Sequence, residues 1–128
     1  MSKKKDTLDA AILDRLYDVL CSRKDADPSQ SYTAKMFGKG ITKIAQKVGE
    51  EGVETALAAV AESRESLLEE SADLLYMLLL LWAAKDVKPK EVYAILDERF
   101  GKSGIREADN GNGKNKSKSK SKDIGEDK

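Results

Sequence analysis

Two clusters of acidic residues have the types and spacing that could support chemistry. Glu51 and Glu54 lie three positions apart near the middle of the chain, and Glu70 and Asp73 repeat this spacing further on. Residues three apart on a helix project from the same side. Converging carboxylate oxygens are the ligands that Mg²⁺ and Mn²⁺ prefer in proteins. The spacing therefore predicts a carboxylate site for a hard divalent cation, provided that both segments are helical.

The two clusters lie at equal distances from a plausible turn. The pairs Glu51 with Asp73 and Glu54 with Glu70 are both centred on residue 62. In an antiparallel hairpin that turns at residues 62–63, the members of each pair would face one another, roughly 12–17 Å from the turn. Helices packed about 8–10 Å apart bring such side chains within reach of one ion. Four carboxylates this close repel one another strongly unless a cation neutralises them.

An ordinary solvated acidic face is the alternative explanation for each cluster. We assign Glu62, Glu65 and Glu69 to such a face, because charged residues at helical spacing are common. The second cluster, however, precedes the most apolar segment of the chain, residues 74–82, where burying an unneeded charge is costly. That position and the symmetry about the turn favour the metal site.

Three lysines and two glycines near the first cluster each allow two interpretations. Lys39, Lys43 and Lys47 recur at four-residue steps toward Glu51, which suits either a polyphosphate ligand or simple ion pairing along a helix. Gly49 and Gly52 lie inside a predicted helix, where each costs about 1 kcal/mol relative to Ala. They would permit the close approach of another helix or of a ligand.

Composition excludes several classes of site. The 128-residue chain has no His and only one Cys, Cys21, which argues against zinc and excludes histidine bases and Ser-His or Cys-His nucleophiles. The 23 basic and 23 acidic residues balance, but residues 110–128 hold six Lys and three acidic residues, which leaves 17 basic and 20 acidic in 1–109. This mildly acidic part argues against nucleic acid as a partner. Without a secretory signal or an apolar run of about 20 residues, we expect no membrane partner and a soluble, cytoplasmic protein.

The hydrophobic period is helical throughout, so we predict an all-α bundle of four to five helices. The expected helices cover residues 7–22, a short stretch from 32 to about 38, residues 42–62, 64–85 and 89–100. Ser31 and Ser63 are good N-caps, and Pro89 suits a first helical turn.

The predicted organisation is one domain, residues 1–109, followed by a lysine- and serine-rich tail, residues 110–128, of a composition typical of disorder. The segment 74–82 is apolar on every side of its helix and needs cover all round. A homodimer would supply that cover, whereas a monomer would leave an apolar strip exposed.

The motif Glu50-Glu51-x-x-Glu54 followed by Glu70-x-x-Asp73 resembles the signature of the MazG-like all-α nucleoside triphosphate pyrophosphohydrolases. Further segments resemble one branch of that superfamily, the phosphoribosyl-ATP pyrophosphatases of histidine biosynthesis. These segments are residues 31–35, 43–51, 72–76 and 101–104, and the resemblance covers about residues 12–108.

The resemblance implies Mg²⁺-dependent hydrolysis of phosphoribosyl-ATP to phosphoribosyl-AMP and pyrophosphate, by an intertwined homodimer. Transferred to this sequence, the metal ligands would be Glu51, Glu54, Glu70 and Asp73, and Glu50 would assist, as our choice of proton acceptor. Lys43 and Lys47 would meet phosphates. Further substrate contacts would come from two of these segments. Residues 31–35 would contribute Ser31, Tyr32 and Lys35, and residues 101–104 would contribute Lys102 and Ser103.

Two other functions remain open at this point. The same acidic residues would serve a general nucleoside triphosphate pyrophosphohydrolase of the MazG or dUTPase type, which acts on non-standard nucleotides. A non-catalytic helical dimerisation module would show neither pyrophosphate release nor a change of thermal stability with Mg²⁺.

Overall fold

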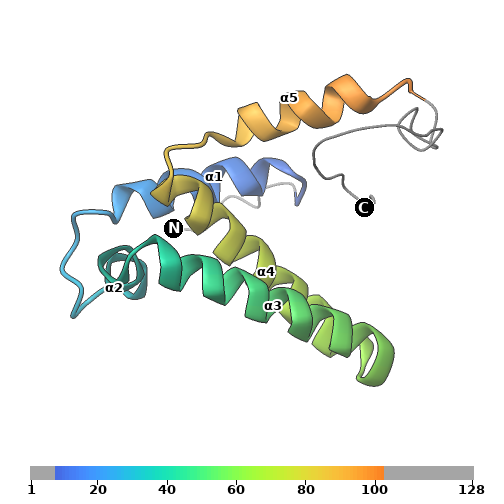
Figure 1. The fold of residues 1–128 in the computed structure, drawn as a ribbon, viewed down its shortest axis with the longest axis horizontal. Helices are drawn as coiled ribbons and strands as arrows, with labels where there is room; N and C mark the ends of the chain where they lie inside the picture. Colours follow the sequence, from blue (N-terminus) through green and yellow to red (C-terminus); the bar gives the residue numbers. More distant parts are fainter. Residues whose placement is uncertain (1–7, 103–128) are drawn as a thin grey trace, which may run out of the picture. The chain divides into compact units, whose positions relative to one another are not determined.

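The computed structural model describes residues 8–102, and its regular elements in this range are all helices. They are, in chain order, α1 (Ala11–Ser22), α2 (Tyr32–Lys39), α3 (Ile41–Ala61), α4 (Arg64–Ala84) and α5 (Pro89–Arg99) (Figure 1). These residues fall into two compact units with a boundary between Val92 and Tyr93. The predicted all-α fold class is confirmed. The tail predicted for residues 110–128 lies outside the described residues.

Serine caps and a glycine that can be read from the sequence set several of the helix boundaries. Ser31 accepts a hydrogen bond from the Ala34 N–H at 3.1 Å, and Ser63 accepts one from the Ser66 N–H at 3.1 Å. Both serines thus satisfy an amide that a helix start would otherwise leave without a partner. A single residue, Gly40, joins α2 to α3 with φ at 94°, a left-handed conformation that favours glycine.

The first helix begins later than predicted. We expected it to start at Thr7, which lies outside the described residues, but α1 starts at Ala11. The carboxylate of Asp9 accepts a hydrogen bond from the Ala11 N–H at 3.0 Å, which competes with continuing the helix toward the N-terminus. Leu8 is 86% exposed, so no packing pulls the preceding turn into the helix.

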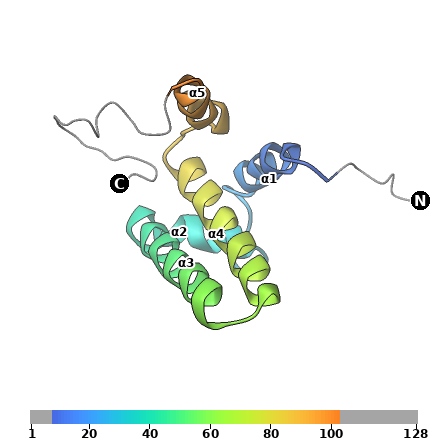
Figure 2. The same cartoon turned by 90° about the vertical axis from the view of Figure 1, so that its right-hand side faces the viewer.

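Helices α3 and α4 form a long antiparallel hairpin, visible in Figure 1 and, turned by 90°, in Figure 2. The turn falls at Glu62 and Ser63, where the sequence predicted it. Their mutual packing is the most extensive between any two helices in the described residues. Helix α1 packs against α4, and α2 packs against α3. The hairpin therefore carries and positions the acidic residues of the predicted site.

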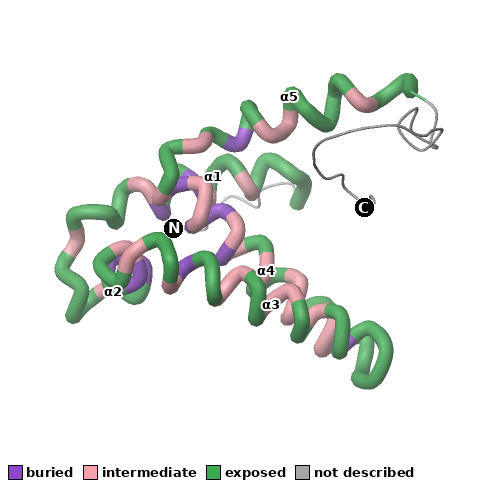
Figure 3. Tube along the Cα trace, viewed as in Figure 1, coloured by how far each residue is buried: buried purple, intermediate pink, exposed green. Residues whose placement is uncertain are grey.

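The core lies at one end of this hairpin. Its buried residues come from α1, α2, α3 and the C-terminal half of α4, and they are Leu20, Met36, Ile44, Met77, Leu79 and Leu80. Figure 3 shows these buried stretches gathering near the start of α3, whereas the far end of the hairpin is mostly exposed. The segment 74–82 is only partly covered, since Leu75 remains 43% exposed.

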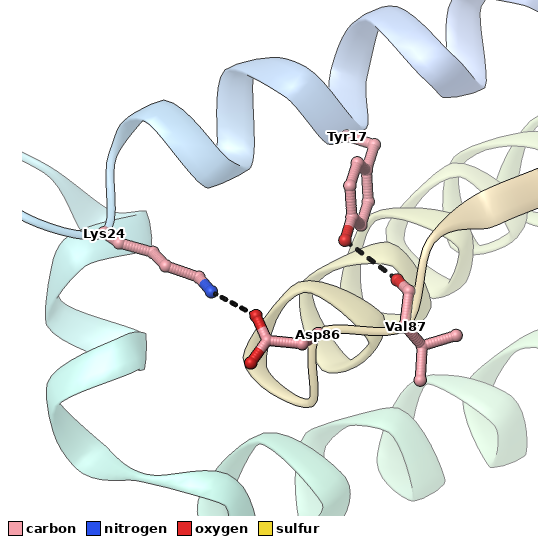
Figure 4. A network of polar contacts seen from close by, with 4 residues as sticks. All are labelled: Tyr17, Lys24, Asp86 and Val87. Atoms are coloured by element: carbon pink, nitrogen blue, oxygen red, sulfur yellow. Dashed lines mark hydrogen bonds and ion pairs between the residues drawn. The ribbon is translucent and has the colours of Figure 1, made fainter.

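Polar contacts tie α1 to the end of α4 (Figure 4). The Tyr17 hydroxyl donates a hydrogen bond of 2.8 Å to the carbonyl of Val87, and Lys24 pairs with Asp86 at 3.3 Å. Burial, aided by the neighbouring Cys21 thiol, raises the pKa of Tyr17 to about 12. The Tyr17 hydroxyl therefore stays protonated at neutral and moderately alkaline pH, where it can donate its hydrogen bond to Val87.

Candidate active site

The two arms of the hairpin bring three of the predicted carboxylates together. One carboxylate oxygen each from Glu51 on α3 and from Glu70 and Asp73 on α4 lie within 4.8 Å of one another. Ligand oxygens on opposite sides of a Mg²⁺ ion are about 4 Å apart, because each bond is 2.0–2.1 Å long. Small side-chain rotations would thus bring these oxygens to a common ion.

Two oxygens in this group have nothing to bind within the described residues. Oε1 of Glu51 and Oε1 of Glu70 are buried, and neither accepts a hydrogen bond there. A buried, unpartnered carboxylate oxygen is costly, since it has lost its water without gaining a donor. The donor set is all oxygen and negatively charged, so a hard divalent cation fits it.

Two carboxyl groups of the site have raised pKa values, because they are partly desolvated and lie close to other carboxylates. Burial raises the pKa of Glu51, and the carboxylates of Glu54 and Asp73 raise it further, while Lys47 opposes them in part. Burial also raises the pKa of Glu70, and the neighbouring carboxylates, Glu54 first among them, add to the shift. These shifts mark the group as one that a cation would stabilise.

Glu54 lies at the edge of the group formed by Glu51, Glu70 and Asp73. Its side chain is exposed, but it raises the pKa of both Glu51 and Glu70, so it lies beside the α4 carboxylates as the hairpin register predicts. It is not among the three residues whose oxygens converge. Its role as a fourth ligand stays a prediction.

Glu50 turns away from the other carboxylates. Its side chain is exposed, accepts a hydrogen bond from the Gln46 amide at 2.8 Å, and pairs with Lys47 at 3.5 Å. The bond from Gln46 and the charge of Lys47 lower the pKa of Glu50. Gln46, Gly49, Glu50, Val53 and Glu54 line a hollow of about 530 Å³ on this outer side of α3. The structure therefore places Glu50 next to the predicted ligands but not among them.

The lysines divide between two helices. Lys39 ends α2, and Gly40 separates it from α3, so Lys39 does not continue the face of Glu51 as the four-residue steps suggested. Lys43 and Lys47 are half-buried on α3. The ion pair between Lys47 and Glu50 is present, and contact of either lysine with phosphate stays a prediction.

Helix α2 places one of the predicted substrate contacts at the site. Tyr32 joins Glu51, Asp73, Tyr76 and Met77 in lining a cavity of about 360 Å³. Its ring centre lies 6.4 Å from that of Tyr76, a separation typical of aromatic pairs.

The remaining predicted contacts take other positions. The Ser31 hydroxyl is occupied by its capping bond, and Lys35 is exposed on α2. Lys102 is exposed in the second unit, and Ser103 lies outside the described residues.

Sequence reasoning missed the part played by three residues near the carboxylates. Tyr76 follows Asp73 by three positions, and its hydroxyl lies 2.6 Å from that of Thr33 on α2. The Thr55 hydroxyl lies 2.7 Å from the Glu51 carbonyl and 3.1 Å from the Glu70 carbonyl. Helical spacing offered the signal, since Tyr76 shares a helix side with Asp73, and Thr55 shares one with Glu51.

The fold and this site define a class, that of helical proteins in which carboxylates of two helices form a cluster that a hard cation would fit. A family model described as phosphoribosyl-ATP pyrophosphohydrolase matches residues 13–100. The chain belongs to the phosphoribosyl-ATP pyrophosphohydrolase family.

Curated relatives agree with this assignment. The chain is 56% identical to a phosphoribosyl-ATP pyrophosphatase of Paramagnetospirillum magneticum, over 77% of this chain and 91% of the relative. It is 52% identical to the protein of that name from Azospirillum brasilense, over 80% and 93% of the two chains. A third, from Parvibaculum lavamentivorans, is 52% identical over 77% and 91%. Within the described residues, no helix has the length and apolar character needed to span a membrane.

Proposed function

We propose that this chain hydrolyses phosphoribosyl-ATP to phosphoribosyl-AMP and pyrophosphate, the second step of histidine biosynthesis, with Mg²⁺ as its cofactor and Mn²⁺ as a possible substitute. One observation carries the proposal. In a chain of this family, oxygens of Glu51, Glu70 and Asp73 converge, and two of the side chains in that group have a buried oxygen without a partner. A hard cation would remove that energetic cost, and a phosphoanhydride needs such a cation.

The carboxylates divide the work by position. Glu51, Glu70 and Asp73 would hold the cation, and Glu54 would add a fourth carboxylate from the exposed edge. When bound, Mg²⁺ supplies positive charge for the phosphate oxygens and acidifies a water molecule. Glu50 would accept the proton that the attacking water loses, after its side chain leaves Gln46 and Lys47 and turns toward the other carboxylates. Lys43 and Lys47 lie on the same helix and add positive charge for the polyphosphate.

The cavity beside the carboxylates suits the nucleoside part of the substrate. Two tyrosine rings and the Met77 side chain give it apolar walls, while Glu51 and Asp73 form its polar end. Small-molecule sites commonly combine an apolar lining with a few polar groups in this way. The substrate's phosphates would therefore meet the cation while its flat base lies against Tyr32 or Tyr76.

The active form in this proposal is a homodimer, and the supporting feature is an apolar stripe on α3. Val53, Leu57 and Val60 recur at helical spacing and are 61%, 50% and 81% exposed. A side chain added at Gly49, on the same stripe, would meet no atom of the described residues within 4 Å. The stripe passes beside Glu50, so a second copy seated there would close over the proposed proton acceptor. The proposal includes a cytoplasmic location for the protein.

The test is pyrophosphate release from phosphoribosyl-ATP, measured with Mg²⁺ and with the metal chelated. We expect release only with Mg²⁺, and we expect dUTP and other triphosphates to be poor substrates. Preference for dUTP would favour a general nucleotide pyrophosphohydrolase instead. Lack of release from any nucleotide, together with a thermal stability that Mg²⁺ does not change, would leave only a helical dimerisation module.

A further inference from the structure

Thr55 makes a hydrogen-bond pattern that an ordinary helical threonine does not need. Its Oγ1 lies 2.7 Å from the carbonyl of Glu51, one turn back on α3, which is a common bond for threonine in a helix. The same Oγ1 also lies 3.1 Å from the carbonyl of Glu70 on α4. The single hydroxyl proton is thus shared between two helices, and it ties the two arms of the hairpin together at this level.

The two carbonyls belong to the two residues with unpartnered carboxylate oxygens. Glu51 and Glu70 each present a buried Oε1 without a hydrogen-bond partner in the described part of the chain. Thr55 therefore joins the backbones from which these two side chains start.

The precision of such a tie matters because packed helices can shift against one another. Packed helices shift against one another by about 1–2 Å when a protein passes between alternative arrangements. A Mg²⁺ site tolerates far less, since its bonds are 2.0–2.1 Å long and near-octahedral. A hydroxyl bonded to both backbones at the level of the ligands opposes that slide.

We propose that Thr55 is a positioning residue, which holds α3 and α4 at the separation where Glu51 and Glu70 share one divalent cation. This inference rests on the proposed function, in which the converging carboxylates bind Mg²⁺. Thr55 touches neither cation nor substrate and acts through the backbones of the two ligands.

Substitution at position 55 separates the hydroxyl from the bulk of the side chain. Thr55→Val keeps the shape and removes the hydroxyl, whereas Thr55→Ser keeps the hydroxyl. Ser63→Ala is the matched control, because it also removes a hydroxyl from the hairpin but at the turn, away from the carboxylates. The readout is the affinity of the metal-free full-length chain for Mn²⁺ without nucleotide, followed by paramagnetic resonance.

We expect Thr55→Val to weaken Mn²⁺ binding by about 10-fold or more, the usual loss when a group that orients a metal ligand is removed. Thr55→Ser should bind within about 3-fold of the wild type, and Ser63→Ala should bind like the wild type although it is less stable. In the assay with nucleotide, Thr55→Val should need more Mg²⁺ for half-maximal rate, while kcat at saturating Mg²⁺ stays close to wild type.

The outcomes distinguish failure of the inference from failure of the proposed function. A wild-type chain that binds no Mn²⁺ would overturn the proposed function and the inference with it. A wild type that binds Mn²⁺, with Thr55→Val binding equally well, would overturn the role of Thr55 alone. If the valine variant does not fold, Thr55→Ala takes its place with the same expected loss, and equal affinity in a folded alanine variant would also overturn the inference.

Discussion

At the scale of single residues, Glu51 and Glu70 carry charge where charge is costly. Burial and neighbouring carboxylates raise the pKa of both, and each has a buried oxygen without a partner in the described residues. The close approach of these carboxylates destabilises the metal-free protein, and a bound cation would remove that destabilisation. The first two predictions follow from this opposition between stability and binding.

The first prediction concerns Glu70→Gln. Removing one charge from the group should raise the melting temperature of the metal-free protein at neutral pH, because repulsion with Glu51, Glu54 and Asp73 falls. The same change should lower turnover by about 100-fold or more, because the proposed cation would lose one of its ligands. Glu69→Gln, at an exposed neighbouring position, is the control and should alter neither property. Melting curves and pyrophosphate release give the two readouts.

The second prediction is a pH dependence with a definite sign. A carboxyl whose pKa is higher in the folded state than the ordinary 4.5 favours folding at low pH. Its contribution is present below 4.5 and is lost as pH rises through the raised pKa. The melting temperature of wild type minus that of Glu70→Gln, measured in chelator, should therefore fall as pH increases from 4 to 8. A difference that stays constant or rises would contradict the shift, and added Mg²⁺ should reverse the loss near neutral pH.

Residue types and spacing identified the carboxylates but not every orientation. Equal spacing about residue 62 correctly placed Glu51 opposite Asp73 and Glu54 beside Glu70. It could not reveal that Gln46 and Lys47 would bind the Glu50 carboxylate on the outer side of α3. Competing side-chain bonds of this kind depend on rotamers, which periodicity does not report.

At the scale of elements, the Ser63 side chain caps the start of α4 at the hairpin turn, away from the acidic residues of the site. Ser63→Ala should destabilise the fold by about 1 kcal/mol, because the Ser66 amide loses its acceptor. Turnover should not change, since the cap lies roughly 10 Å from Glu70 along the helix axis. Ser63→Asp should restore stability, as aspartate is an equally good cap. Denaturant unfolding and the pyrophosphate assay measure the two effects, and a large loss of turnover in Ser63→Ala would contradict this separation.

The helices themselves were largely predictable. The predicted stretches 42–62, 64–85 and 89–100 differ by one residue or less at each end from α3, α4 and α5. Glycine, proline and serine punctuate the apolar period at these ends, so the local signals agree with the packing. The start of α1 was mispredicted because Leu8 extends the apolar pattern without being buried. The tie between Thr55 and α4 was beyond prediction, since it depends on the close approach of two backbones.

At the scale of the whole molecule, the exposed stripe on α3 predicts association. Leu57→Glu should shift the protein from dimer to monomer, because it places a charge in the middle of the apolar surface made by Val53, Leu57 and Val60. Ala59→Glu, on another flank of α3, is the control and should leave the dimer intact. Sedimentation or light scattering measures the mass, and a wild-type monomer at micromolar concentration would contradict the proposed dimer.

The paired carboxylates lie at equal distances from the hairpin turn, and this constrains how the length of the hairpin can change in evolution. Glu70 follows Glu54 by sixteen positions, and adding one residue to either arm would rotate its carboxylates by about 100° and displace them by about 1.5 Å. Exposed side chains between these positions that make none of the contacts described above can change as long as both helices persist, but the number of residues cannot. Genes for working enzymes of this type should therefore tolerate base changes in this stretch far more readily than in-frame insertions or deletions of a single codon.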